Sequence, residues 1–123
     1  MLTVSLGVRM DERIEIINGE VVMIAPPSTA HQLISMELAR QLANYLEGKK
    51  CKAIPAPFAV RLFEKEGDTP GDIDTVVEPD ISVVCDTDKL DKNGCKGAPD
   101  LVVEILSPST QRHDRPVKLD DEV

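Results

Sequence analysis

Two carboxylates stand in apolar stretches of the sequence, where an ionised group is costly to bury. Asp80 follows Pro79 at the start of "ISVV", and Glu104 lies inside "LVVEIL", 24 residues later. A buried carboxylate costs several kcal/mol unless hydrogen bonds, a cationic side chain or a metal ion offset the cost. If the two stretches form neighbouring strands, both side chains reach one edge of a sheet. There they could hold Mg²⁺ or Mn²⁺, which prefer hard oxygen ligands.

A two-carboxylate cation site favours chemistry on phosphate esters, and that chemistry needs one more positive charge. Phosphodiester hydrolysis builds negative charge on the phosphorus oxygens, which a nearby Lys or Arg stabilises. Lys118, near the end of the chain, is the candidate. Spacing alone leaves a structural alternative open, in which Asp80 caps a turn after Pro79 and Glu104 pairs with a basic residue across the sheet.

The elements that position these residues begin with a hairpin and a helix. Asn18-Gly19 separates two apolar runs in "RIEIINGEVVMI", which predicts a two-residue type I′ turn. Next, "STAHQLISMELARQLANYLEGKK" predicts one amphipathic helix of about four turns. Thr29 and Gln32 have the spacing of a capping box, and Gly48 marks the helix end. The expected apolar stripe consists of Ile34, Leu38, Leu42 and Tyr45 or Leu46.

The second half of the sequence predicts strands and the start of a last helix. Pro55 and Pro57 place the first half of "CKAIPAPFAVRLF" at a sheet edge or a bulge. "VVEPDISVVC" and "LVVEIL" are the most strand-like segments, and we expect the second to be a central strand covered on both faces. Residues 86–99 between them are expected to form a polar surface connection. A last helix would begin at Asp114. This order predicts an α+β fold with a mixed sheet.

Composition limits the classes of protein and partner. The 123 residues suit a single domain, and the net charge of −8 disfavours nonspecific binding to a polyanion unless basic groups cluster or metal ions intervene. We interpret the clusters "KKCK" and "QRHDRPVK" as solvated faces.

Three cysteines without a CxxC pair predict reduced thiols, and hence a cytoplasmic location. No signal peptide or membrane-spanning run is expected.

Several motifs, in this order, resemble the Uma2 family, also called DUF820, of restriction-endonuclease-like proteins. They are "INGEVVMIAPPSTAHQLISMELARQLANYL", "PDISVV", "GAPDLVVEILSPST" and the D-x-x-x-K of "DRPVK". The resemblance runs from about Ile14 to about Lys118 and implies the fold of the PD-(D/E)XK nuclease superfamily. It implies that Pro79-Asp80 is the first motif and Glu104 the acid of the second. Glu20 and His31 also match positions typical of the family.

This sequence departs from the pattern of the family and its superfamily in two ways. Leu106 stands where the superfamily motif has a lysine, and Lys118 on the following helix is the matching residue. The family fold also continues beyond "KLDDEV". We therefore expect residues 1–123 to form one domain that lacks the C-terminal part of that fold, with a shortened last helix and exposed apolar sheet surface that favours a homodimer or larger assembly.

The resulting functional prediction is a Mg²⁺- or Mn²⁺-dependent endonuclease that hydrolyses DNA. Asp80 and Glu104, with the backbone carbonyl of Ile105, would hold the metal, and Lys118 would act on the attacking water or the transition-state charge. The alternative is an inactive module of the same fold that acts by binding protein or DNA.

Overall fold

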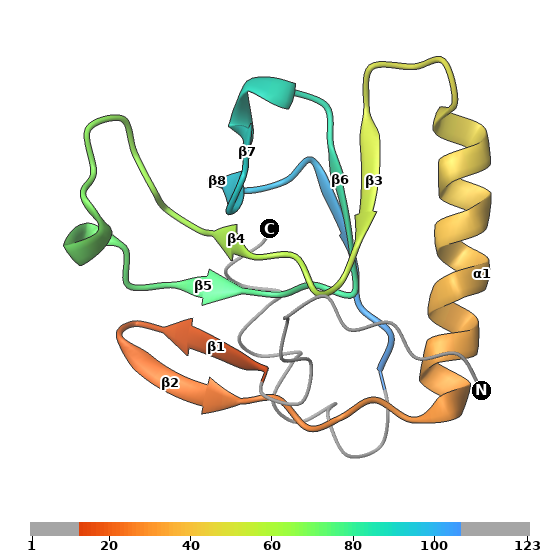
Figure 1. The fold of residues 1–123 in the computed structure, drawn as a ribbon, viewed down its shortest axis with the longest axis horizontal. Helices are drawn as coiled ribbons and strands as arrows, with labels where there is room; N and C mark the ends of the chain where they lie inside the picture. The colour runs from red at the N-terminus through yellow and green to blue at the C-terminus, as the bar shows by residue number, and fades with distance from the viewer. Residues whose placement is uncertain (1–12, 107–123) are drawn as a thin grey trace, which may run out of the picture.

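The computed structural model describes residues 13–106, which form two β-sheets and one α-helix (Figure 1). The six-stranded sheet has the order β2-β1-β5-β4-β8-β7, and the three-stranded sheet has the order β3-β6-β9. Adjacent strands are antiparallel except β4 and β8. The α+β fold with a mixed sheet is thus confirmed. The elements are β1 (Ile14–Ile17), β2 (Glu20–Met23), α1 (Thr29–Leu46), β3 (Lys52–Pro55), β4 (Val60–Arg61), the 3₁₀ turn η1 (Pro70–Asp72), β5 (Val76–Val77), β6 (Ile81–Val84), the 3₁₀ turn η2 (Thr87–Lys89), β7 (Leu90–Asp91), β8 (Gly94–Lys96) and β9 (Leu101–Val103).

The N-terminal hairpin is confirmed with its predicted turn. Ile17 pairs with Glu20, so Asn18 and Gly19 alone connect β1 to β2. Their φ angles are 51° and 81°. A type I′ turn requires positive φ at both central residues, which Asn and Gly adopt at low cost.

Helix α1 is confirmed, but its cap is one residue earlier than predicted. Ser28 is the N-cap, and its hydroxyl accepts a hydrogen bond of 3.1 Å from the backbone N–H of His31. The proposed Thr29 and Gln32 capping box is therefore wrong, because Ser28 already occupies the cap position. At 18 residues the helix has about five turns rather than four.

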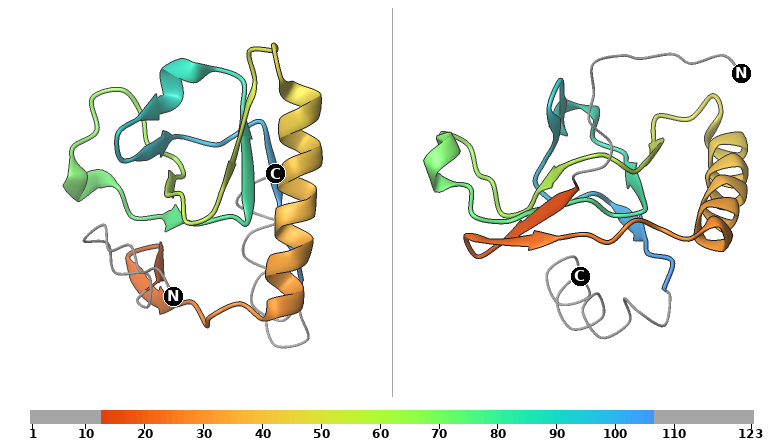
Figure 2. Two further views of the ribbon diagram at one scale, coloured as in Figure 1. Left: turned by 45° about the vertical axis from the view of Figure 1, so that its right-hand side comes forward. Right: turned by 60° about the horizontal axis from the view of Figure 1, so that its bottom comes forward.

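The apolar stripe of α1 is only partly buried. Leu38, Leu42 and Leu46 are half-buried, whereas Ile34 and Tyr45 are exposed. The helix packs beside β3, the edge strand of the three-stranded sheet (Figure 2). A helix that contacts the side of a sheet covers a narrower stripe than one lying across its face. Of the two positions that its prolines predicted for β3, a sheet edge or a bulge, the structure shows the edge.

The predicted central strand is wrong within the described residues. β6 is the central strand of its sheet, and all four of its residues are buried. β9 pairs with β6 along one side and ends at Val103, so Glu104 follows the strand rather than standing inside it. Pro79 also divides the other strand-like segment, so that β5 and β6 belong to different sheets.

The connection between β6 and β9 is more structured than predicted. It contains η2 and the hairpin of β7 and β8, and β8 pairs in parallel with β4. A Cβ atom added at Gly94 would lie 2.1 Å from the carbonyl oxygen of Ala59, so this close approach requires glycine. Cys95 is fully buried beside it. The connection thus lies mostly at the surface, as expected, but Gly94 and Cys95 are buried.

The cysteines are not all reduced. A disulfide joins Cys51 and Cys85, which lie just beyond the β3–β6 ladder, where Lys52 pairs with Val84. The register thus places the two cysteines opposite each other. Reduced thiols were predicted for all three cysteines, which is wrong for this pair and removes one basis for the cytoplasmic location. Cys95 is a free thiol, and burial raises its pKa.

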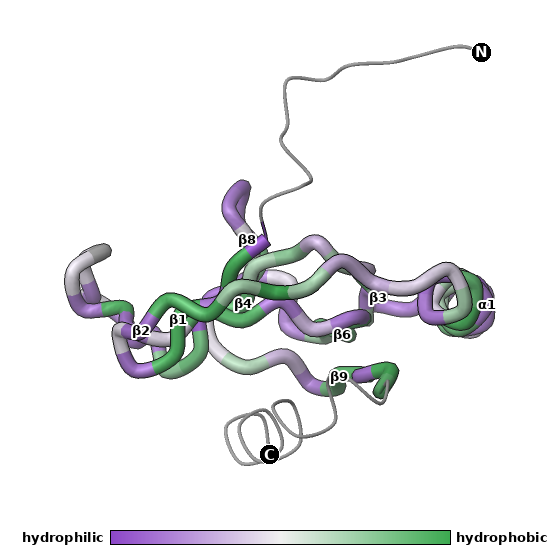
Figure 3. Tube along the Cα trace, turned by 90° about the horizontal axis from the view of Figure 1, so that it is seen from below, coloured by the Kyte–Doolittle hydropathy of each residue, from purple (hydrophilic) through white to green (hydrophobic). Residues whose placement is uncertain are grey.

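The core lies where the six-stranded sheet meets β6. It consists of Val60, Leu62, Val77, Val84 and Cys95, all at most 1% exposed. Figure 3 shows a hydrophobic segment along β1, which is separated from β4 by β5 in the sheet. Among the described residues, no helix is long and apolar enough to cross a membrane. The predicted helix from Asp114 lies outside the described residues.

Candidate functional site at the junction of β6, β9 and α1

Asp80 and Glu104 meet where β6 begins and β9 ends. The pairing of Ile81 with Val103 places Asp80 opposite Glu104 one position further along the antiparallel ladder. The backbone N–H of Asp80 donates to Glu104 Oε1 at 2.8 Å. In return, the backbone N–H of Ile105 donates to Asp80 Oδ2 at 2.7 Å. Each strand end therefore supplies a carboxylate that accepts an N–H from the other. The structure thus brings the two predicted residues together.

His31 is the third member of this cluster. Its ring Nε2 lies 3.2 Å from Asp80 Oδ2, and its Nδ1 lies 3.1 Å from Gln32 Oε1. An ionised carboxylate only accepts hydrogen bonds, so Nε2 is the donor toward Asp80. The Ser28 cap fixes the turn that carries His31, and the side chains of His31 and Asp80 are only 14% and 18% exposed.

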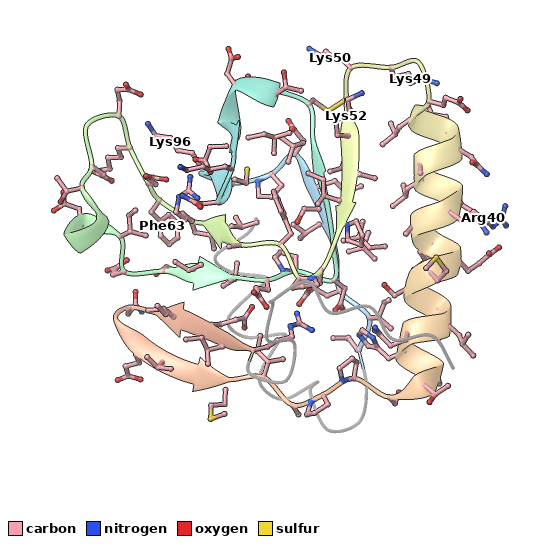
Figure 4. All side chains as sticks on the ribbon, viewed as in Figure 1. Arg40, Lys49, Lys50, Lys52, Phe63 and Lys96 are labelled. Carbon is pink, nitrogen blue, oxygen red and sulfur yellow. A yellow bond between two sulfur atoms is a disulfide. The ribbon has the colours of Figure 1, made fainter. Side chains whose placement is uncertain are left out.

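Glu20, the other predicted residue that the structure describes, is not part of this cluster. Glu20 begins β2 at the tip of the hairpin and is exposed, away from the start of α1 (Figure 1). Lys118 lies outside the described residues. Lys49, Lys50 and Lys52 surround the turn at the opposite end of α1 from His31 (Figure 4). The lysine Nζ of Lys49 donates to Tyr45 O at 2.8 Å on this exposed surface.

The sequence interpretation missed an arginine beside the cluster. Arg13 immediately precedes β1, and its Nε donates to Glu78 Oε1 at 2.9 Å. The backbone N–H of Glu78 donates to Glu15 Oε2 at 2.8 Å, and Glu15 is 5% exposed. The sequence held a signal for Glu15, because this carboxylate stands in the apolar run "IEII", as Asp80 stands beside an apolar run. Glu15 would have led to Glu78, and Glu78 to Arg13.

A pocket of about 150 Å³ opens beside Asp80. Besides Asp80, three segments that are distant in sequence line it, namely the residue before β1, the start of α1 with the proline before it, and the chain after β3. The backbone N–H of Ala56 donates to Asp80 O at 2.9 Å and so fixes the third segment against the site. The lining residues are Arg13, Pro27, Gln32, Ser35, Ala56, Pro57 and Asp80.

The two acids fit a hard divalent cation by the chemistry of their donor atoms. Among the described residues, Asp80 Oδ1 accepts no hydrogen bond, although Oδ2 accepts two. In residues 13–106, no group of three or more His, Cys, Asp or Glu is arranged to hold a metal ion. Mg²⁺ commonly takes one or two carboxylates and completes its shell with water and substrate phosphate. The same contacts also suit a structural role, because each carboxylate satisfies a backbone N–H.

Comparison with known proteins assigns the chain to one family. The family model described as "Putative restriction endonuclease", Uma2, matches residues 3–121. The uncharacterized protein slr1290 of Synechocystis sp. strain PCC 6803 is 30% identical over 107 residues, which are 87% of this chain and 52% of that protein.

A solved structure supports the fold. The crystal structure of a putative nuclease belonging to DUF820 from Anabaena variabilis superposes with a TM-score of 0.62 at 23% identity, covering 86% of this chain and 56% of that one. The chain thus spans about half the length of both relatives. Because the family model covers nearly the whole sequence, the chain belongs to the Uma2 family of restriction-endonuclease-like proteins.

Proposed function

We propose that this chain is a metal-dependent DNA endonuclease in which Asp80 and Glu104 hold Mg²⁺ or Mn²⁺. The observation that carries the proposal is the reciprocal pair of hydrogen bonds that brings both carboxylates to one strand junction. Two carboxylates held close together repel each other unless a cation or hydrogen bonds compensate. Membership of the Uma2 family supports a nuclease and therefore DNA as the substrate.

The described residues act mainly by fixing the carboxylates. Ile105 N–H and the His31 ring both hold Oδ2 of Asp80, which restricts rotation of that carboxylate. Asp80 N–H holds Glu104 Oε1 in the same way. Such preorganisation lowers the cost of assembling a charged site. A divalent cation bound there would polarise the phosphate and lower the pKa of a water. Lys118 stays our candidate for stabilising transition-state charge.

The alternative function is a non-catalytic module that binds a protein or DNA partner. The observation in its favour is that backbone N–H groups already compensate both carboxylates without a cation.

Self-association and a cytoplasmic location also stay predictions. The exposed Val21 and Met23 on β2, an edge strand of the six-stranded sheet, support self-association.

A cleavage assay separates these functions. Plasmid, linear duplex and single-stranded DNA are incubated with the protein in Mg²⁺, in Mn²⁺ and in EDTA. We expect cleavage only with metal, and at least about a hundredfold loss in Asp80→Asn and Glu104→Gln, because each removes a charged ligand.

Asp88→Asn, in the exposed turn η2, is the matched control and should retain full activity. Failure of the wild type to cleave any of the substrates with either metal would contradict the nuclease proposal. Equal activity in EDTA would contradict its metal dependence.

A further inference from the structure

The pocket beside Asp80 has a lining that two metal ligands do not explain. Its volume of about 150 Å³ is similar to that of a cavity that holds benzene, so it can hold one small group of a substrate. Pro27, Ala56 and Pro57 form apolar walls, while Arg13, Gln32 and Ser35 contribute polar groups.

A neutral polar group of the lining offers a hydrogen-bond donor. The side-chain amide of Gln32 lies 3.1 Å from His31 Nδ1, so one end of this amide is already engaged. Within residues 13–106, the Ser35 hydroxyl has no hydrogen-bond partner, and it can donate to a ligand. It therefore suits a ligand that is rich in acceptor oxygens.

Arg13 adds a fixed positive charge to the same pocket. Its Nε is bound to Glu78, and its side chain is only 19% exposed, which restricts its rotamers. Among the described residues, its two Nη atoms have no partner. A guanidinium group binds phosphate through such paired N–H donors, and one that is already ordered loses little entropy on binding.

We infer that this pocket binds the phosphodiester group next to the scissile one, with Arg13 as its main contact. The inference rests on the proposed function, since Asp80 serves both as a metal ligand and as part of the pocket lining. The carboxylate of Asp80 opposes binding of an anion, and the proposed cation offsets that repulsion. Arg13 thus supplies a positive charge next to the cation, at a position fixed by Glu78.

Binding of a labelled oligonucleotide tests the role of Arg13. A fluorescein-labelled single strand of about 12 nucleotides is titrated in Ca²⁺, which takes the same oxygen ligands, at several salt concentrations. Arg13→Gln should weaken binding about tenfold or more. It should also reduce the slope of log K against log salt by about 0.7, the value for one lost phosphate contact. Arg13→Lys should restore the slope, since it keeps the charge.

The matched control is Arg40→Gln. Arg40 is exposed on α1 and pairs with Glu37, and it does not line the pocket, so the same substitution removes a charge outside it. It should leave both affinity and slope nearly unchanged. An unchanged slope in Arg13→Gln, or a wild type that binds no oligonucleotide, would overturn the inference.

A second pair of variants tests the pocket if Arg13→Gln does not fold. Ser35→Glu places a negative charge in the pocket, whereas Ser35→Gln adds a side chain of the same size without charge. The glutamate variant should bind more weakly by about tenfold, and equal affinity of the two would contradict the inference. If the wild type cleaves DNA but these variants bind the oligonucleotide as the wild type does, the proposed role of the pocket is overturned and the nuclease proposal stands. If these variants change binding but the wild type does not cleave DNA, the nuclease proposal alone is overturned.

Discussion

The two ends of β6 lie in opposite environments. At its C-terminal end, Val84 is fully buried in the apolar cluster with Val60 and Leu62. Just before its N-terminal end, Asp80 is partly exposed and is held by hydrogen bonds to His31 and Ile105. Apolar packing is non-directional and depends on the area buried, whereas the site depends on a few oriented bonds. One strand thus connects the part that stabilises the fold to the part proposed to bind metal.

The largest expected effect on stability is at the apolar end. Leu62→Ala should lower the free energy of unfolding by about 2 to 5 kcal/mol, because it removes buried methyl groups and leaves a cavity. Leu33→Ala, at a 68% exposed position on α1, is the matched control and should change stability by less than about 0.5 kcal/mol. Urea unfolding measures both. Equal losses would show that the core lies elsewhere.

A smaller effect of opposite sign is expected in the middle of β6. Ser82 is fully buried, and its hydroxyl has no hydrogen-bond partner in the described part of the chain. Ser82→Ala should therefore raise the free energy of unfolding by about 1 kcal/mol. Ser28→Ala, which removes the helix cap, should lower it by about 1 kcal/mol. Thermal melts compare the two, and a destabilised Ser82→Ala would indicate a partner for this hydroxyl.

The smallest effect concerns an ion pair on the six-stranded sheet. Hydrogen bonding to Arg61 lowers the pKa of Asp91 below its usual value of 3.8. A lowered pKa in the folded state contributes stability that is present above the unfolded pKa and lost as pH falls through the folded one. Asp91→Asn should therefore reduce the loss of stability below about pH 4.

The size of this effect should be a few tenths of a kcal/mol, because the Asp91 side chain is 47% exposed. Melts from about pH 6 to about pH 2.5, repeated in about 1 M salt to screen the pair, provide the measurement. An identical pH dependence in wild type and variant at low salt would contradict this contribution of Asp91.

Local patterns in the sequence predicted the hairpin, the helix and the two acids. Asn18-Gly19 specifies its turn by backbone conformation, and a carboxylate in an apolar run is conspicuous without any structure. Glu104 was nevertheless predicted to lie inside a strand, because the apolar run continues to Leu106 whereas β9 ends at Val103.

Contacts between distant segments were the part that local reasoning missed. Arg13 and Glu78 are 65 residues apart, and neither has a spacing that indicates the other. The Cys51–Cys85 disulfide depends on the register of β3 against β6, which a cysteine count does not reveal. His31 was indicated only by the family resemblance, since a histidine at a helix start is usually structural. Lys118 stays a prediction.

Metal binding by the native chain tests the central claim most directly. Thermal melts of wild type, Asp80→Asn and Glu104→Gln are recorded with and without Mn²⁺. Wild type should gain about 2.7 kcal/mol when Mn²⁺ is at about a hundred times its dissociation constant. The two variants should gain almost nothing, and without metal their stability should be unchanged or raised, because removing one charge relieves repulsion. A wild type that gains no stability from Mn²⁺, together with a clearly destabilised Glu104→Gln, would contradict the metal site and leave a structural role for both acids.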